Sequence, residues 1–104
     1  MRTPYQPTIE CIKLTSVLHA LSDPTRLKIA RSLYNNHEQC PSTYLEMNIA
    51  KSTLSHHLKV LRESGVLKVR IECKQHYYSL RKEDLDFLFP GLLEAIFQTD
   101  ENLI

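Results

Sequence analysis

Hydroxyl, imidazole and ammonium groups recur at helical spacing between Lys51 and Gly65, in the segment K-S-T-L-S-H-H-L-K-V-L-R-E-S-G. Positions three or four residues apart share one face of a helix, and Leu54, Leu58 and Leu61 would form the opposite, apolar stripe. The polar groups can donate hydrogen bonds to phosphate oxygens and to base edges, while the leucines dock the helix on its own domain. The spacing therefore predicts a recognition helix that enters a nucleic-acid groove.

The candidate DNA-binding residues come from this helix and from the segment that follows it. On the helix they are Ser52, Thr53, Ser55, His56, Lys59 and Arg62. After the helix they are Arg70, Lys74, Gln75 and His76. Arg62 either reaches phosphate or pairs within its own helix. His57 lies beside the leucines, so we expect it to be half-buried. For Arg26, at the start of an earlier helix, a phosphate contact and a structural role are both open.

Charge is distributed unevenly along the chain, although the formal net charge is only +1. Residues 51–82 carry eight Lys/Arg and two Glu, a net of +6, whereas residues 83–104 carry six Asp/Glu and no Lys/Arg, a net of −6. A basic run is often only a solvated face, but this one coincides with the predicted recognition helix. The coincidence favours a surface that binds phosphates, with the acidic segment pointing away from it.

Composition narrows the class of protein. A chain of 104 residues with 42% hydrophobic and 24% charged residues is expected to form one globular domain. No apolar run reaches the roughly 20 residues needed to cross a membrane. Three widely spaced cysteines do not suggest a disulfide framework, so we expect a cytoplasmic protein. Neither a nucleophile–base spacing nor a Gly-rich phosphate loop is present, so we expect no enzyme activity and no cofactor.

Apolar periodicity before the recognition helix predicts three further helices, over residues 8–21, 24–35 and 41–47. Asp23 is a good N-cap for the second of them, and Pro24 suits its first position.

Residues 66–80 predict a β-hairpin, because apolar and charged residues alternate from Leu67 to Glu72 and β-prone residues return from Tyr77 to Leu80. The connection near residues 73–75 lacks glycine, so it is not an ideal tight turn.

A last helical face runs from Leu85 to Phe97, interrupted at Pro90–Gly91 by a kink or by a short turn before a helix that starts at Pro90. A small domain gains by pairing such an apolar face with a second copy of itself, although packing on its own core is the alternative. We therefore expect a homodimer joined by the first and last helices. The expected interface residues are Ile9, Ile12, Leu88, Phe89, Leu92, Leu93, Ile96 and Phe97.

The predicted order is helix, helix, helix-turn-helix, β-hairpin, helix. This order is a winged helix-turn-helix, a mainly α fold with a β-hairpin wing (α+β). We expect a flexible N-terminal arm over residues 1–7, the DNA-binding and dimerisation domain over residues 8–99, and a C-terminal tail over residues 100–104.

Three segments resemble the ArsR/SmtB family of small bacterial repressors, in the family's order and at its spacings. They are L-S-D-P-T-R-L-K-I (21–29), S-T-L-S-H-H-L-K-V-L-R-E-S-G (52–65) and Y-Y-S-L (77–80). The resemblance implies a homodimeric repressor that leaves its operator when an inducer, often a metal ion, binds. Ala50 stands where the family usually has Ser or Thr before the recognition helix, which costs about 0.5–2 kcal/mol of capping unless Ser52 or a backbone group substitutes.

The family's two usual metal sites are not matched, so we expect no metal at either. In the thiol motif E-L-C-V-C-D-L, this chain has Gln39 and Pro41 at the cysteine positions and Cys40 at the valine. One thiol beside a proline is not a soft-metal site. In the last-helix site, Asp84 and Asp86 align at the start, but Phe97 stands where the later histidine would be and Asp100 stands at the last position.

The main hypothesis is a sequence-specific DNA-binding regulator, an ArsR-type repressor that an unidentified signal releases from double-stranded operator DNA. One alternative is a thiol-based redox or As(III) sensor that uses Cys11 and Cys40, against the simpler interpretation that both thiols are inert. Another is a winged-helix module for protein interaction, which would usually lack the net charge of +6 on the recognition helix and wing.

Overall fold

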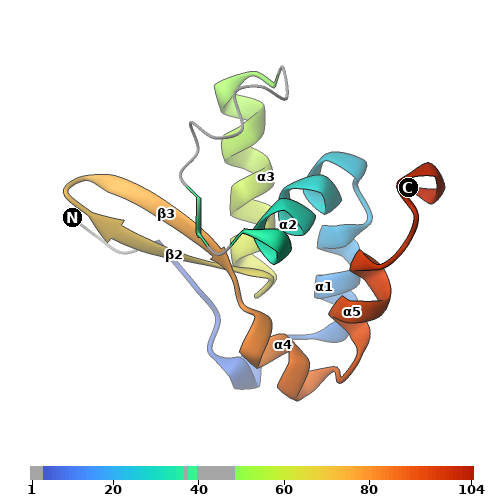
Figure 1. Ribbon diagram of the computed structural model, residues 1–104. Coiled ribbons are helices and arrows are strands. Elements are labelled where there is room, and N and C mark those ends of the chain that lie inside the picture. The colour runs from blue at the N-terminus through green and yellow to red at the C-terminus, as the bar shows by residue number, and fades with distance from the viewer. Residues whose placement is uncertain (1–3, 37, 40–48) are drawn as a thin grey trace.

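The computed structural model describes residues 4–36, 38–39 and 49–104 and has the predicted winged helix-turn-helix architecture (Figure 1). The elements in chain order are η1 (Ile9–Cys11), α1 (Leu14–Leu21), α2 (Pro24–Asn35), β1 (Glu38–Gln39), α3 (Lys51–Glu63), β2 (Leu67–Glu72), β3 (Gln75–Leu80), α4 (Lys82–Leu88), α5 (Leu92–Phe97) and η3 (Glu101–Leu103). The expected helix over residues 41–47 lies outside the described residues. Within the described part of the chain, no helix is long and apolar enough to span a membrane.

Apolar side chains from the helices and from the two long strands form a single core. On α3, Leu54, Leu58 and Leu61 are all buried, which confirms the predicted stripe. Burying a leucine side chain contributes about 1.5–3 kcal/mol, so this stripe is enough to fix which face of α3 meets solvent. The fully buried side chains of the core include Val17, Ile29, Leu61, Val66, Leu67, Leu85 and Leu93.

The first helix is shorter than the predicted span of residues 8–21. Ile9–Cys11 form one 3₁₀ turn, and α1 begins only at Leu14, after an extended step at Ile12. This step buries Ile12 against Gly65, where a Cβ atom would lie 2.6 Å from the Ile12 Cγ1. The burial of Ile12 against Gly65 takes the place of a continuous helix. The periodicity of residues 8–21 could not indicate this, because Gly65 is distant in the sequence.

The second helix confirms its predicted ends. The Asp23 carboxylate accepts a hydrogen bond from the backbone N–H of Arg26 at 3.0 Å, and Pro24 occupies the first helical position. The helix ends at Asn35, and Asn36 follows in an extended conformation.

The sheet contains one strand that the sequence reasoning missed. The strand order is β1-β3-β2, and all pairs are antiparallel. β1 is only two residues long and pairs with β3, with Glu38 opposite Ser79. β2 and β3 are joined by a two-residue turn in which Cys73 and Lys74 both have positive φ, 50° and 67°. The hairpin is therefore tighter than the absence of glycine suggested.

The last helical face is divided into α4 and α5, as the Pro90–Gly91 interruption predicted. Helix α5 starts at Leu92, after Gly91 in the left-handed conformation, and not at Pro90. The turn lets Leu93 and Phe97 pack into the core, where the ring of Phe97 lies 4.8 Å from that of Tyr34. Figure 1 shows α4 and α5 at the end of the molecule opposite the N-terminal end of α3.

The segment before η1 lies against β2 and α3. The side-chain amide of Gln6 exchanges two hydrogen bonds with the backbone of Val69, at 2.9 and 3.3 Å. The carbonyl of Tyr5 accepts a hydrogen bond from Arg62 Nε at 2.9 Å. Within the arm that the sequence predicts to be flexible over residues 1–7, Tyr5 and Gln6 thus make specific contacts, and Gln6 occupies the free edge of β2 at Val69.

Candidate nucleic-acid interface

One face of α3 is exposed and polar. The side chains exposed on it are Ser52, Thr53, Ser55, His56 and Lys59, all of them predicted DNA-binding residues. The helix starts after Ala50, and no side chain caps it there. Because the first backbone N–H groups of a helix lack partners within the helix, this end adds donors and the positive end of the helix dipole to the same face. The face can therefore donate to phosphates and base edges.

Arg26 connects three helices beneath this face. It is buried, and its Nε donates a 2.7 Å hydrogen bond to the carbonyl of Ala20 at the end of α1. Its Nη1 lies 3.4 Å from Nδ1 of His57, which is half-buried as expected. The backbone N–H of Arg26 also lowers the pKa of the Asp23 carboxyl, because that hydrogen bond favours the charged form. The sequence leaves a phosphate contact and a structural role open for Arg26. Its burial and its contacts with α1 and α3 are those of a structural residue.

Two arginines of the basic segment, residues 51–82, have partners within the chain itself. Arg62, a predicted DNA contact, donates to the carbonyl of Tyr5, and its side chain is only 13% exposed. Arg81 has a side chain that is 9% exposed and pairs with Asp84 at 2.9 Å. The sequence pattern could not show that Arg62 has a partner as distant along the chain as the carbonyl of Tyr5.

The wing presents the remaining predicted residues. Lys74 and Gln75 are exposed at the tip, and His76 is half-buried with its ring 6.4 Å from that of Tyr78. The exposed ammonium groups of Lys51, Lys59 and Lys74 have no ion-pair partner in the described part of the chain. These lysines are therefore available for phosphate.

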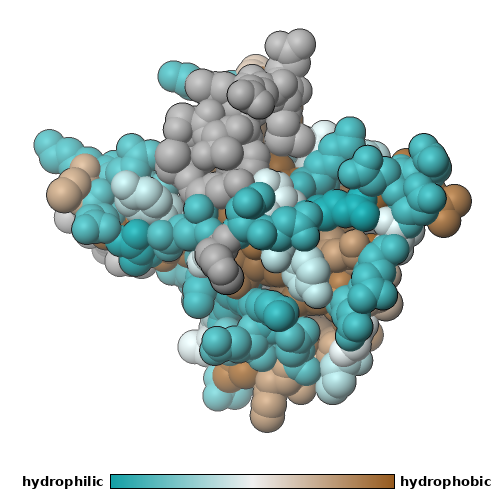
Figure 2. Space-filling view, viewed as in Figure 1, coloured by the Kyte–Doolittle hydropathy of each residue, from teal (hydrophilic) through white to brown (hydrophobic). Residues whose placement is uncertain are grey.

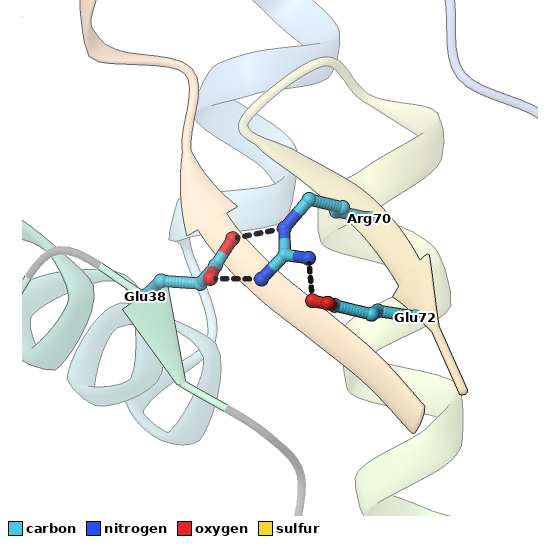
Figure 3. A network of polar contacts seen from close by, with 3 residues as sticks. All are labelled: Glu38, Arg70 and Glu72. Atoms are coloured by element: carbon cyan, nitrogen blue, oxygen red, sulfur yellow. Dashed lines mark hydrogen bonds and ion pairs between the residues drawn. The ribbon is translucent and has the colours of Figure 1, made fainter. Parts of the chain in front are cut away.

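Arg70, also a predicted DNA contact, is held between two carboxylates (Figure 3). Its Nη2 and Nε donate to the two carboxylate oxygens of Glu38, at 2.8 and 3.2 Å, and its Nη1 donates to Glu72. The guanidinium also lies 4.7 Å from the centre of the Tyr77 ring. The hydrogen bonds from Arg70 lower the pKa of the Glu38 carboxyl, and the two carboxylates raise the pKa of Arg70. We call Glu38, Arg70 and Glu72 the wing cluster.

The residues expected at a dimer interface fall into two groups. The core of the single chain already buries Ile12, Leu93 and Phe97. The second group is only partly buried in the single chain and consists of Ile9, Leu88, Phe89, Leu92 and Ile96. The expected set did not include Leu14 and Leu18 on α1, which are 43% and 44% exposed, or Phe87 on α4, which is 76% exposed. Figure 2 shows hydrophobic surface at the end of the molecule where α4 lies.

The cysteines do not form a described site. Cys11 is exposed and accepts a hydrogen bond from the Thr8 hydroxyl at 3.4 Å, and Cys73 is exposed in the hairpin turn. Cys40 lies outside the described residues, so the Cys11–Cys40 hypothesis is untested. Within those residues, no group of three or more His, Cys, Asp and Glu side chains could hold a metal ion.

A winged helix-turn-helix with an exposed polar and basic recognition helix defines a class, the DNA-binding transcriptional regulators. The family model described as "Bacterial regulatory protein, arsR family" matches residues 23–69. The chain belongs to this family, and it is a DNA-binding transcriptional repressor and not an enzyme.

Individual relatives agree with this assignment. The chain is 38% identical to the HTH-type transcriptional regulator YceK of Bacillus subtilis, over 77% of this chain and 82% of that protein. It is 36% identical to the arsenical resistance operon repressor of Staphylococcus xylosus, over 77% of each chain. The solved structure of the transcriptional repressor PagR of Bacillus anthracis matches with a TM-score of 0.65 and 25% identity, over 83% of this chain and 91% of that one.

Proposed function

We propose that the protein acts as a homodimer that binds a two-fold symmetric operator and represses the adjacent genes until a signal releases it. The observation that carries the proposal is the exposed face of α3, where hydroxyl, imidazole and ammonium groups stand opposite a buried leucine stripe. Two such helices about one DNA turn apart, on the order of 34 Å, would enter successive major grooves. A cytoplasmic location follows from this role.

Within α3, each group has its own task in the proposal. Ser52, Thr53 and Ser55, near the helix start, donate to phosphate or to base edges, because the helix dipole favours negative charge there. His56 donates to a guanine acceptor or to phosphate, and Lys59 neutralises phosphate. Those of the five residues that reach base edges would define the sequence that is read.

The wing adds contacts to the DNA backbone. Lys74 and Gln75 at its tip are exposed and point to phosphate or minor-groove contacts, with His76 behind them. Arg62 contributes to the proposal by fixing the N-terminal arm against α3, because its guanidinium already donates to Tyr5.

The dimer in this proposal forms through α1 and the last two helices. Leu14 and Leu18 are exposed on α1, and Leu88, Phe89, Leu92 and Ile96 are only partly buried in the single chain. A second copy would remove this apolar surface from water. The same interface would set the distance between the two recognition helices. A signal that changes the packing of this interface would therefore alter operator affinity, with a coupling free energy of about 1–3 kcal/mol.

The test is binding of the purified protein to DNA from its own promoter region at several salt concentrations. We expect saturable, sequence-selective binding whose affinity falls steeply with salt. Lys59→Ala should lower the affinity and reduce the slope of log K against log[salt] by about 0.9, the loss of one phosphate contact. Lys28→Ala, which removes an exposed lysine from α2, is the matched control and should change neither. Equal behaviour of the two variants, or no selective binding by the wild type, would contradict the proposal and favour a protein-interaction module.

A further inference from the structure

We propose that Glu38 limits the affinity of the wing for DNA by holding Arg70 in the wing cluster, so that Glu38 weakens binding to operator and unrelated DNA alike. This inference rests on the proposed function.

The sheet geometry brings the two residues together from distant parts of the sequence. Arg70 on β2 stands opposite Tyr77 on β3, and Glu38 on β1 stands opposite Ser79 on the same strand. β3 therefore separates the two outer strands, and the Arg70 side chain reaches across it to Glu38 on the exposed side of the sheet (Figure 3). The contact exists only because β1 pairs with β3.

The donors that Arg70 gives to Glu38 are the ones that a phosphate would use. Its Nε and Nη2 form a two-pronged contact with both oxygens of that carboxylate, and its Nη1 is directed to Glu72. Guanidinium binds phosphate in the same two-pronged geometry, so carboxylate and phosphate compete for one edge of the side chain. Arg70 is thus not available to DNA in the way that Lys59 and Lys74 are.

The net charge of the wing cluster also disfavours a contact with phosphate. Two carboxylates surround one guanidinium, so the wing cluster carries a net charge of −1 where a phosphate would approach. A weaker electrostatic contact lowers binding to any DNA sequence, because phosphate contacts carry no sequence information. Glu38 would therefore lower the affinity for operator and for unrelated DNA by about the same factor.

Altering the cluster should not unfold the domain. The Arg70 side chain is 51% exposed and the Glu38 side chain 34% exposed, and ion pairs at such positions contribute little to stability. Glu38→Gln keeps the shape of the side chain and removes its charge. Thermal unfolding of each variant provides the check that β1 and the wing remain folded.

The experiment compares affinities for operator and for unrelated duplex DNA between 0.1 and 0.2 M salt. Glu38→Gln should bind both operator and unrelated DNA about four- to eightfold more tightly, with a slope steeper by about 0.9, as one added phosphate contact requires. Arg70→Ala alone leaves two unpaired carboxylates and should lower affinity by less than Lys59→Ala does, and in the Glu38→Gln background it should abolish the gain. Glu72→Gln leaves the two-pronged contact in place and should give a smaller gain. The control is Glu83→Gln on α4, which removes the same charge outside the cluster.

Two results would overturn the inference. One is an equal effect of Glu38→Gln and Glu83→Gln, which would reduce Glu38 to a general charge effect. The other is a loss of affinity in Arg70→Ala as large as that in Lys59→Ala, which would make Arg70 a direct phosphate ligand. If the wild type binds its operator and Lys59→Ala weakens it, either result removes only this inference. If the wild type shows no selective binding, the proposed function fails as well.

Discussion

Ile12 lies directly over Gly65, so close that a Cβ atom on the glycine would be 2.6 Å from Cγ1 and 2.8 Å from Cδ1 of the isoleucine. Gly65 follows the C-terminal end of α3 and has a φ of +91°. This contact joins the segment before α1 to the end of the recognition helix.

Gly65→Ala should destabilise the domain by about 2–5 kcal/mol, the sum of a left-handed conformation and an overpacked contact. Denaturant unfolding measures it. Gly91→Ala is the matched control, because Gly91 also has a positive φ, +82°, but no atom lies within 4 Å of the added Cβ. It should cost only about 1–2 kcal/mol. Equal costs for the two variants would show that Ile12 does not restrict residue 65.

Asp23→Ala should lower the free energy of unfolding by about 0.5–2 kcal/mol at neutral pH, because α2 loses its N-cap. Asp23→Asn keeps an acceptor and should be nearly as stable as the wild type there. The N-cap hydrogen bond lowers the pKa of Asp23 in the folded state. Its contribution is therefore present above about pH 4, the unfolded value, and is lost as the pH falls through the lower folded pKa.

Unfolding of wild type and Asp23→Asn at pH 7 and at pH 3 tests this sign. The difference between them should shift in favour of the asparagine variant at acid pH, because asparagine has no charge to lose. A difference that is the same at both pH values would mean that the Asp23 charge does not contribute.

The variant Cys73→Asn/Lys74→Gly should stabilise the hairpin by about 1 kcal/mol. Both residues of the turn have positive φ, the conformation for which Asn-Gly is preferred in two-residue hairpin turns. Thermal unfolding should show a rise of roughly 4–8 °C for a domain of this size. Cys73→Ser removes the thiol without the conformational gain, so a double variant no more stable than Cys73→Ser would contradict the prediction.

Leu18→Glu should weaken the proposed dimer, because it would place a charge in an apolar interface. We expect the dimer dissociation constant to rise at least about thirtyfold, roughly 2 kcal/mol, and operator affinity to fall with it. Analytical ultracentrifugation at micromolar protein measures the change. Leu103→Glu on η3 is the control, since Leu103 is 78% exposed in the tail. An unchanged mass for Leu18→Glu would exclude α1 from the interface.

Local patterns predicted the elements that depend on neighbouring residues. The leucine stripe of α3 follows from a period of 3.6, the start of α2 from Asp23 and Pro24, and the alternation in β2 from a period of 2. Each of these signals acts over a few residues, so the chain itself contains the information. The exposed polar face of α3 was predictable for the same reason.

Signals of this kind failed where a distant residue decided the outcome. The helix predicted over residues 8–21 is broken because Ile12 packs on Gly65, and β1 forms only by pairing with β3. The turn at Cys73–Lys74 adopts a conformation that its own residues disfavour, and the paired strands on either side impose it.

For the basic surface, too, local sequence signals predicted one part and distant contacts determined the other. The sequence by itself determined a winged helix-turn-helix, the face of its recognition helix and a basic segment, because periodicity and composition are local properties. Only the tertiary structure decided which of those charges face solvent, since Arg62 donates to a carbonyl 57 residues away and Arg70 to a carboxylate 32 residues away. Hydrogen bonds and ion pairs depend on distance in space, and the packed core sets that distance.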